Sequence, residues 1–299
     1  MRNFLKITDF TTDELYHILD RANELQEHWS NNNMPKSLEK ERIALWSQGN
    51  GFRNRMAFEI GARSMGAEVS YVPGDLGIHE PIEDIGYYLK NWFTMMVIRA
   101  ISYDHLQTIA ETSALPTINA RTAYNHPCEI IGDLQFIRKQ RGSLDSLNVI
   151  FVGEIANVSR SWLEAVIRLP INLIQVAPEE YLLSKNELNG INANAVGELS
   201  TSVDLNEVVT KKTDLIYTDC WPYSKNKEEI RELFLPYQIT YKILEKINDQ
   251  GLFLPCPPVT RGNELSSDSL LSGKCKVYEA KEYLLHSQNA IMEFLIKER

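Results

Sequence analysis

Charged and polar residues that can do chemistry follow several apolar runs of this 299-residue chain. An arginine or a histidine can hold an anion or a developing oxyanion, and a carboxylate or an amide can hold an amine. The carboxyl ends of parallel strands share one edge of a sheet, so such residues would converge there on an anionic substrate. The set comprises Arg53, Arg55, Arg99, His126, Glu129, Asn157, Asp219 and Arg261.

The elements that must position these residues alternate between strand and helix. Capping residues at 11–14 predict the start of an N-terminal helix. Apolar runs predict strands at 43–46, 69–72 and 95–99, with helices at 55–65 and 85–92. After a polar break near residue 142 the pattern restarts, with strands at 147–153, 172–176, 214–219 and 252–255 and a helix at 161–168. The last helical segment, at 266–297, is long enough to be two helices. Such alternation is typical of parallel sheets covered on both faces.

The fold class that follows is α/β, with two doubly wound parallel-sheet (Rossmann-like) domains and the active site in the cleft between them. We expect the first domain to span residues 1–141 and the second to span residues 142–282. The C-terminal helix, about residues 283–299, is expected to join the first domain. The pattern G-x-G-x-x-G is absent after Val152, which disfavours a nicotinamide cofactor.

Composition excludes several classes of protein. With 31 Lys and Arg against 40 Asp and Glu, the formal net charge is −9, which disfavours nucleic acid as a partner. No apolar run reaches the roughly 18–20 residues of a membrane span, and no signal-peptide pattern is visible, so we expect a soluble, cytoplasmic protein without membrane contact. The four cysteines lie far apart and the six histidines lack metal-ligand spacing. We therefore expect no disulfide framework, no metal site and no cofactor.

Seven segments between residues 51 and 262 resemble, in order, the aspartate/ornithine carbamoyltransferases. One match alone is weak evidence, but seven in order favour membership of the family, closer to its ornithine branch. The segments are Gly51–Glu59, for the family's Ser-Thr-Arg-Thr-Arg-x-Ser-Phe-Glu; Gly77–Asp84; Met96–Arg99; Asn119 with His126–Asp133, for Asn…His-Pro-Cys-Gln-x-x-x-Asp; Val152–Ser161; Tyr217–Trp221; and Leu254–Gly262, for Cys-Leu-Pro-x-x-Arg-Gly.

The resemblance implies a carbamoyl-phosphate-type first domain. In the family's reaction an uncharged amine attacks the carbonyl carbon of carbamoyl phosphate, a tetrahedral oxyanion forms, and phosphate leaves. Arg99 and His126 would hold the carbonyl oxygen, and Glu129 stands where the family has a glutamine that accepts from the carbamoyl NH2. The residues of the phosphate loop, which would open a helix, are Gly51, Phe52, Arg53 and Asn54.

The second domain would bind the acceptor. Cys256 would lie beside the attacking amine, and Arg261 would contact the carbamoyl side of the transition state. The resemblance also implies a homotrimer in which a mobile loop with His79 and Glu80 closes over a neighbouring subunit's site. The residues implied to bind the acceptor are Asn119, Asn157, Asp219, Tyr223 and Ser224.

Several positions depart from the family pattern. Gly51 and Phe52 replace a serine and a threonine, Asn54 replaces a second threonine, and each lost donor to phosphate costs roughly 1.5–3 kcal/mol. The carboxylate of Glu129 would pair with an arginine, repel a phosphate, or meet a cationic donor group. Pro222–Ser224 replaces the Ser-Met-Gly loop of the ornithine enzymes.

Three functions stay open at this point. The first is a carbamoyltransferase that acts on an amino acid or a diamine. The second is a transferase whose donor carries an amidino or other cationic group. The third is a non-catalytic relative that binds an amino acid or assembles with a partner.

Some candidate residues also have a structural interpretation. Arg55 and Glu59 lie one helical turn apart and can form an ion pair. Cys256 can be a small buried residue, and Trp221 can pack in the core at a strand end. His126 can be a loop histidine with satisfied hydrogen bonds, and the loop at 79–80 can be merely solvated.

Overall fold

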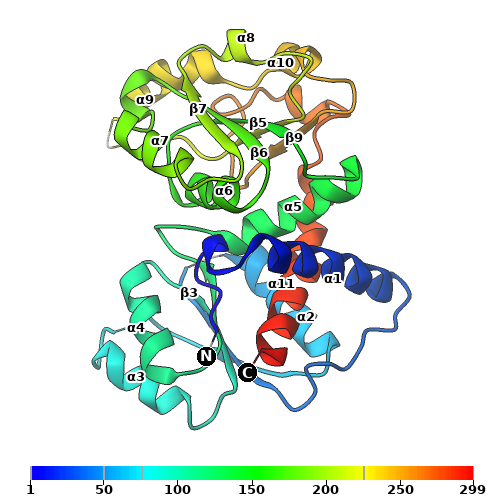
Figure 1. The fold of residues 1–299 in the computed structure, drawn as a ribbon. Helices are drawn as coiled ribbons and strands as arrows, with labels where there is room; N and C mark the ends of the chain where they lie inside the picture. Colours follow the sequence, from blue (N-terminus) through cyan, green and yellow to red (C-terminus); the bar gives the residue numbers. More distant parts are fainter. Residues whose placement is uncertain (1, 50, 76, 225, 299) are drawn as a thin grey trace. The chain divides into compact units, whose positions relative to one another are not determined.

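The structure, a computed structural model, describes residues 2–49, 51–75, 77–224 and 226–298. The chain is divided into two compact units (Figure 1). The first unit comprises Met1–Gln140 and Lys281–Arg299, and the second comprises Arg141–Ala280. The unit boundaries fall inside two helices, α5 (Pro127–Arg141) and α11 (Val277–Lys297).

The first unit contains a four-stranded parallel sheet in the order β2-β1-β3-β4. Its strands are β1 (Arg42–Ser47), β2 (Glu68–Val72), β3 (Met95–Arg99) and β4 (Thr117–Arg121). Besides α5 and α11, its helical elements are η1 (Ile7–Asp9), α1 (Thr12–Ser30), α2 (Phe52–Ser64), α3 (Ile82–Leu89) and α4 (Tyr103–Ser113).

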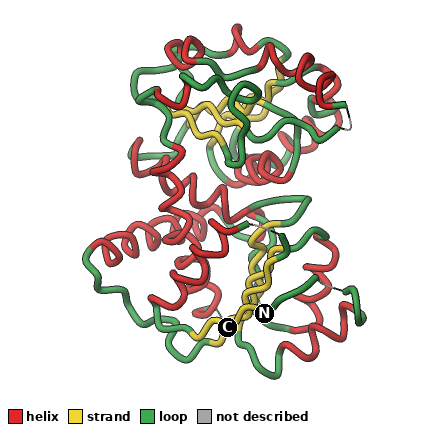
Figure 2. The backbone as a smooth tube through the Cα atoms, turned by 180° about the vertical axis from the view of Figure 1, so that it is seen from behind, coloured by secondary structure: helices red, strands yellow, loops and turns green. Residues whose placement is uncertain are grey.

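Both faces of this sheet are covered by helices (Figure 2). Alternate residues of β1 and β3, Trp46 and Ile98 among them, form a buried cluster with apolar side chains of α3 and α4. The intervening residues, such as Leu45 and Val97, are buried as well and point to the opposite face because side chains alternate along a strand. On that side α2 packs against β1 and β2.

The second unit contains a five-stranded parallel sheet in the order β7-β6-β5-β8-β9. Its strands are β5 (Leu147–Val152), β6 (Ile171–Val176), β7 (Glu198–Ser202), β8 (Leu215–Thr218) and β9 (Leu252–Pro255). Its helical elements are α6 (Asn157–Arg168), η2 (Glu179–Tyr181), α7 (Lys185–Asn192), α8 (Leu205–Val208), α9 (Lys227–Phe234), η3 (Leu235–Tyr237), α10 (Tyr241–Lys246) and η4 (Ser269–Leu271).

The second sheet is also covered on both faces. Ile150, Ile216 and Phe253 belong to a buried cluster with residues of α8 and α10. On the other side, the Trp162 ring of α6 packs edge-on against the Tyr217 ring of β8, with ring centroids 5.3 Å apart. The α/β class and the two doubly wound parallel sheets predicted from the sequence are therefore confirmed.

All seven predicted strands agree with the structure to within one residue. Apart from β2, whose residues are exposed or half-buried, each is a largely buried apolar run. The N-terminal helix begins as predicted, since the Thr11 side chain accepts a hydrogen bond from the Glu14 N–H, 3.3 Å away, and the Glu14 carboxylate accepts from the Thr11 N–H. Several elements had not been predicted: β4, β7, α4, α5, α7, α8, α9 and α10.

Three helix starts were wrongly predicted, and the long helical segment at 266–297 is divided into η4 and α11. α2 begins at Phe52, directly after its N-cap Gly51, and α3 begins at Ile82, directly after Pro81. α6 begins at Asn157 because the Ser159 hydroxyl accepts from the Ala156 N–H at 2.6 Å. The segment 266–297 is not one helical stretch, since residues 274–276 pair with Phe253 of β9 before α11 begins.

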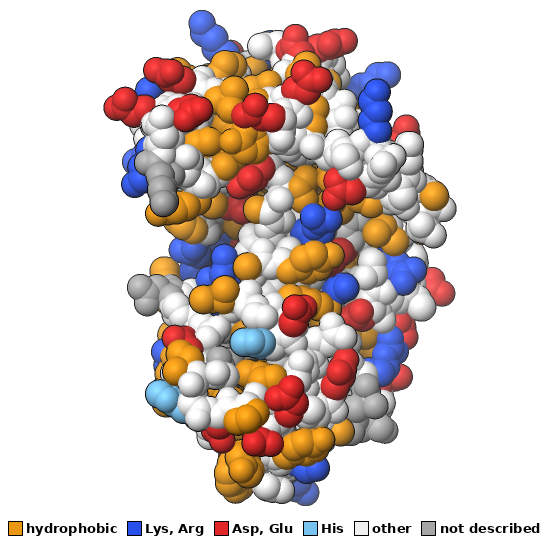
Figure 3. Space-filling model, turned by 90° about the vertical axis from the view of Figure 1, so that its left-hand side faces the viewer, with side chains coloured by type: hydrophobic (Ala, Val, Ile, Leu, Met, Phe, Trp, Pro, Cys, Tyr) orange, Lys and Arg blue, Asp and Glu red, His pale blue; other side chains and the backbone are white. Residues whose placement is uncertain are grey.

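The surface carries charges of both signs. Figure 3 shows one face on which acidic and basic side chains are interspersed with patches of hydrophobic ones. Among the described residues, no helix combines the length and apolar character required to cross a membrane.

Candidate active site

The carboxyl ends of β1, β3 and β4 bring together the candidate residues of the first unit. The register pairs Ser47 with Arg99 and Arg99 with Arg121. Just beyond the strands, the Gln48 N–H donates to the Arg99 carbonyl and the Ala100 N–H donates to the Arg121 carbonyl, each at 2.9 Å. This edge is where an open parallel sheet binds its ligands, so Arg99 stands where the sequence predicted a functional arginine.

The side chain of Arg99 reaches the beginning of α2. A Cβ added to Gly51, the N-cap of that helix, would lie 2.5 Å from Arg99 Cζ and 2.6 Å from Arg99 Nε. The guanidinium therefore occupies the space that a side chain at position 51 would need. A cation and the positive end of a helix at one point favour an anion there.

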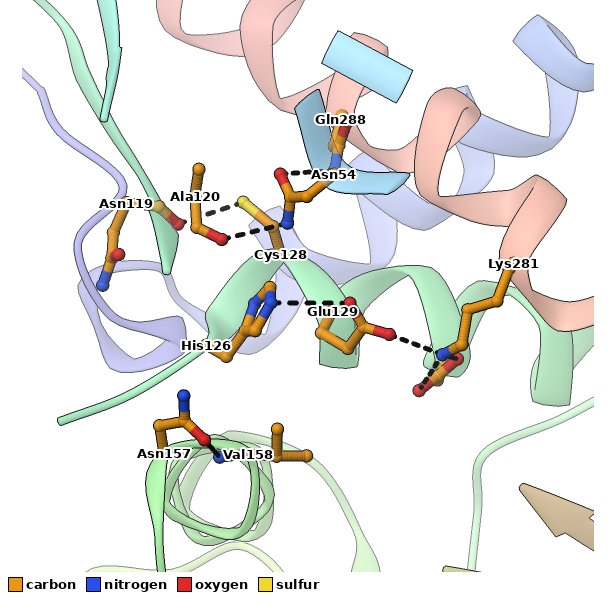
Figure 4. A network of polar contacts seen from close by, with 11 residues as sticks. Asn54, Asn119, Ala120, His126, Cys128, Glu129, Asn157, Val158, Lys281 and Gln288 are labelled. Carbon is orange, nitrogen blue, oxygen red and sulfur yellow. Dashed lines mark hydrogen bonds and ion pairs between the residues drawn. The ribbon is translucent and has the colours of Figure 1, made fainter. Parts of the chain in front are cut away.

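The next residues of α2 have different environments. Phe52 is 64% exposed, and its ring lies 5.1 Å from the Arg53 guanidinium carbon. Asn54 is buried, and its amide donates to the Ala120 carbonyl at 3.0 Å and accepts from the Gln288 amide at 3.4 Å (Figure 4). Asn54 thus ties α2 to β4 and α11, and its phosphate-binding role stays a prediction.

A buried network of amides shapes the loop that carries His126. The Asn119 amide donates to the Leu5 carbonyl at 3.0 Å and to the Asn125 side-chain oxygen at 2.6 Å. The Asn125 amide also donates to the Leu5 carbonyl. These bonds fix the loop between β4 and α5, a role of Asn125 that the sequence analysis had missed. The acceptor-binding role of Asn119 stays a prediction.

His126 and Glu129 face one another at the start of α5, and Lys281 of α11 completes the group (Figure 4). His126 Nε2 lies 3.5 Å from one Glu129 oxygen, and Lys281 Nζ donates to the other at 2.6 Å. Lys281 also donates to Asp133 at 2.9 Å. The sequence had suggested an arginine as one possible partner for Glu129. The structure adds this lysine, from a segment 152 residues away, and the charge of Arg53 also acts on Glu129.

Burial and charge set the protonation of this group. Burial lowers the pKa of His126 to about 3; Glu129 opposes this effect, whereas Arg99, Arg121 and Lys281 add to it. Burial alone would raise the pKa of Glu129, but the charge and hydrogen bond of Lys281, together with the charges of His126 and Arg53, outweigh it and bring that pKa to about 2. Near neutral pH the histidine is therefore neutral and the glutamate is ionised.

A hollow of about 270 Å³ adjoins these residues. Its polar lining consists of Arg53, Lys281, Glu282 and His286, and its apolar lining includes Met56, Ile60 and Leu285. Charges of both signs therefore border this hollow of the first unit.

Arg55, by contrast, has a structural role. Its guanidinium carbon lies 3.9 Å from the centre of the Tyr71 ring, and its Nε lies 3.7 Å from a Glu59 oxygen. The predicted ion pair one helical turn apart is confirmed.

In the second unit, the carboxyl ends of β5, β8 and β9 lie side by side, with Thr218 paired to both Val152 and Pro255. Asp219 and Cys256 follow directly, and the Cys256 N–H donates to the Thr218 carbonyl at 2.7 Å. Cys256 is only 4% exposed, so its structural interpretation as a small buried residue is confirmed. Its place beside an attacking amine stays a prediction.

Glu264 ties together the loops that carry Asp219 and Arg261. One of its oxygens accepts from the Trp221 N–H at 2.9 Å, and the other accepts from the Thr260 N–H at 2.7 Å. Glu264 is buried, whereas Arg261 is exposed. The sequence analysis had missed Glu264, because nothing local marks a carboxylate as a loop anchor. Trp221 packs in the core, as predicted.

The remaining acceptor candidates lie at helix and loop positions. Asn157 is the first residue of α6, is nearly buried, and its side-chain oxygen accepts from the Val158 N–H at 2.9 Å (Figure 4). Tyr223 is 93% exposed, and the Ser224 hydroxyl accepts from the Asn226 N–H. Their roles toward an acceptor stay predictions.

His79 and Glu80 lie in an exposed loop between β2 and α3. Their solvated placement is confirmed, and closure of the loop stays a prediction. Within residues 2–49, 51–75, 77–224 and 226–298, no cluster of three or more His, Cys, Asp or Glu side chains is arranged to hold a metal ion.

Comparison with known proteins assigns a family description to each half of the chain. Residues 2–139 match the family profile described as aspartate/ornithine carbamoyltransferase, carbamoyl-P binding domain. Residues 145–295 match the profile described as aspartate/ornithine carbamoyltransferase, Asp/Orn binding domain.

Individual relatives agree in sequence and in structure. The ornithine carbamoyltransferase of Acinetobacter baumannii is 31% identical over 304 residues, which cover 100% of this chain and 98% of the relative. The solved ornithine carbamoyltransferase from Pyrococcus furiosus superposes with a TM-score of 0.92 at 25% identity, covering 97% of this chain and 96% of that one. The anabolic enzyme from Campylobacter jejuni superposes with a TM-score of 0.90 at 25% identity over the full length of both chains.

Proposed function

Because the chain belongs to the aspartate/ornithine carbamoyltransferase family, we propose that it transfers the carbamoyl group of carbamoyl phosphate to the side-chain amine of an amino acid. The new bond joins the amine nitrogen to the carbonyl carbon. The bond between that carbon and the phosphate oxygen breaks, and the proton lost by the amine leaves with phosphate.

The observation that carries this proposal is the position of Arg99 against Gly51. The guanidinium meets the N-terminus of α2, and Arg53 extends from the same turn of helix. Two arginines and a helix N-terminus can hold both the phosphate and the carbonyl oxygen of one donor molecule. Fixed donors of this kind stabilise the negative charge that develops as the amine attacks.

The charge of Glu129 no longer requires a cationic donor. Its carboxylate lies 2.6 Å from the ammonium group of Lys281, which also pairs with Asp133, and the charge of Arg53 acts on it as well. Opposite charge is therefore already supplied by the protein. A neutral carbamoyl group is therefore preferred to an amidino group, whose positive charge would have to compete with Lys281.

For the acceptor we propose ornithine or a close homologue. The relatives described above are named for ornithine, and the second unit matches the Asp/Orn binding description. Asn157 and Asp219 would hold the α-carboxylate and α-amino groups, and Cys256 would line the path of the attacking amine. The exposed Tyr223 replaces part of the loop that covers the acceptor side chain in the family. If the acceptor differs from ornithine, we therefore expect it to differ in side-chain length. Assembly as a cytoplasmic homotrimer belongs to the same proposal.

The test is an acceptor panel with purified protein and carbamoyl phosphate. Ornithine, lysine, 2,4-diaminobutyrate, 2,3-diaminopropionate and putrescine are each incubated, and ureido product and phosphate are measured together. The proposal expects equal amounts of both, with an amino acid preferred over putrescine. Arg99→Met serves as the inactive control.

Two results would contradict the proposal. In a thermal-shift assay, an amidino donor could stabilise the protein while carbamoyl phosphate does not. That result would favour a transferase with a different donor. Binding of an amino acid without any ureido product from any acceptor would favour a non-catalytic relative.

A further inference from the structure

Side chains at the end of β1 tie down the exposed loop between β2 and α3. The Trp46 indole N–H donates to the Gly74 carbonyl at 2.8 Å. Two residues further along, the Gln48 amide donates to a carboxylate oxygen of Asp75 at 3.0 Å. Gly74 and Asp75 lie just after β2, so the loop starts from a fixed place at the edge of the sheet where Arg99 ends β3.

Gln48 also holds the backbone on both sides of Ala100. The Gln48 N–H donates to the Arg99 carbonyl, and the side-chain oxygen of Gln48 accepts from the Ile101 N–H, each at 2.9 Å. These two bonds fix the direction in which the chain leaves β3. Because the Arg99 side chain reaches the start of α2 from this point, the place of its guanidinium depends on that direction.

The partners of the Gln48 side chain fix the orientation of its amide. The Asp75 carboxylate accepts hydrogen bonds, whereas the Ile101 N–H only donates. An amide meets both demands, with its nitrogen toward the carboxylate and its oxygen toward the N–H. A glutamate at position 48 would still accept from Ile101, but its second oxygen would face the carboxylate across the distance that is now 3.0 Å. Two like charges so close together repel.

We propose that Gln48 is a positioning residue that links Arg99 to the loop between β2 and α3, with Asp75 setting the orientation of its amide. A shift of the loop moves Asp75, the amide and the chain beside Arg99 together. An anion held by Arg99 therefore stabilises the tethered loop, and loss of the tether weakens the hold on the anion, because both effects express one coupling free energy. The inference rests on the proposed function for identifying this anion with carbamoyl phosphate.

The first test exchanges the two partners. In Gln48→Glu, repulsion by Asp75 displaces the side chain, and we expect the Kd of carbamoyl phosphate, measured by calorimetric titration, to rise about tenfold or more. Asp75→Asn alone leaves an oxygen to which the amide can donate, and should raise this Kd less than about threefold. The double variant again pairs an amide with a carboxylate, and should return the Kd to within about threefold of the wild type.

A matched control makes the same kind of substitution elsewhere in the first unit. The Gln107 amide donates to the Glu111 carboxylate at 2.9 Å on the exposed face of α4. Gln107→Glu also sets two carboxylates against each other, and should leave the Kd of carbamoyl phosphate within about twofold of the wild type. The thermal midpoint should change little in every variant, because Asp75 is exposed and Gln48 is half-buried, so water screens the repulsion.

The second test is hydrogen exchange of the full chain, read by mass spectrometry in peptides from the loop between β2 and α3 and from the turn after β3. Without any ligand, Gln48→Ala and Gln48→Glu should exchange faster than the wild type in both peptides, and the double variant should return to the wild-type rate. Carbamoyl phosphate should slow exchange of the loop peptide in the wild type but not in Gln48→Ala.

A double variant as impaired as Gln48→Glu would overturn the pairing of Gln48 with Asp75. Faster loop exchange in Gln48→Glu at an unchanged Kd of carbamoyl phosphate would overturn the link to Arg99. If the wild type transfers the carbamoyl group and Gln48→Glu binds the donor equally well, the proposed function holds and this inference fails. If the wild type binds no carbamoyl phosphate, the proposed function fails, and exchange without ligand decides whether Gln48 tethers the loop.

Discussion

Replacing Gly51 by serine restores the hydroxyl that the family carries at this position, yet the structure predicts a loss of function. The first side-chain atom of any residue at position 51 would lie 2.5 Å from Arg99 Cζ, closer than two carbon atoms can approach. The guanidinium is the far end of a long side chain, so we expect it to move while the backbone stays in place. The added side-chain atom then pushes the Arg99 guanidinium away from the start of α2.

The size of the effect follows from what Arg99 supplies. A hydrogen bond to a charged group contributes about 1.5–3 kcal/mol. At roughly 1.4 kcal/mol for each factor of ten, Gly51→Ser lowers kcat/KM for carbamoyl phosphate by about 10- to 150-fold. The thermal midpoint changes little, because only a flexible side chain is displaced.

The assay measures steady-state phosphate release, with calorimetric titration of carbamoyl phosphate as a second readout. Gly51→Ala separates the volume of the side chain from its hydroxyl and should lower kcat/KM at least as much as Gly51→Ser. Gly190→Ser is the matched control, since a Cβ at position 190 meets nothing within 4 Å. If Gly51→Ser matched or exceeded the wild type in both readouts, Arg99 would not depend on the glycine and the reasoning would be wrong.

Three other predictions concern pH, packing and the acceptor loops. The folded chain holds His126 with a pKa of about 3, below its ordinary value of 6.5. Between pH 6.5 and pH 3, His126 therefore binds a proton in the unfolded chain but not in the folded chain. The free energy of unfolding should fall by up to about 1.4 kcal/mol per pH unit as pH drops from 6.5 toward 3, and urea titrations of His126→Gln should show a shallower fall. Gly197→Ala should lower the free energy of unfolding by about 1–3 kcal/mol, because its Cβ would overlap the Ile171 backbone oxygen. Gly190→Ala in α7 should raise the free energy of unfolding by up to about 1 kcal/mol, because its Cβ meets no atom within 4 Å and alanine favours the helix. Glu264→Ala should raise KM for the acceptor about tenfold or more and leave KM for carbamoyl phosphate within twofold, since it frees only the loops after β8 and β9.

Each of these three has its own contradicting result. Equal slopes of stability against pH in wild type and His126→Gln would show that the histidine is not held neutral. Equal stability of Gly197→Ala and wild type would mean that the strand can shift to make room. A matching rise in KM for both substrates would show that Glu264 supports the whole fold and not one pair of loops.

The α/β class and the positions of seven strands could be read from the sequence, because most of these strands are short apolar runs. β4 and β7 were missed because polar residues predominate in both. The β3 run ends in Arg99, and this was visible as four apolar residues followed by a charge. Helix starts were harder to predict. α2 is capped by a glycine with no side-chain bond, and α6 is capped by a serine inside the helix, so neither shows the usual signal at its first residue.

The family motifs determined which residues were candidates, since Arg53, Arg99, His126 and Glu129 lie in recognisable local patterns. Their roles depended on partners that no local pattern contains. The sequence marked Glu129 as an unexplained charge, and only the tertiary structure supplied Lys281, 152 residues further along the chain. It likewise marked Gly51 as a lost hydroxyl, and only the fold placed Arg99 in the space of the missing side chain. Local sequence patterns determine which functional groups the chain contains. The protonation state of such a group, and the atoms that its side chain contacts, depend on residues that only the fold brings within a few ångströms.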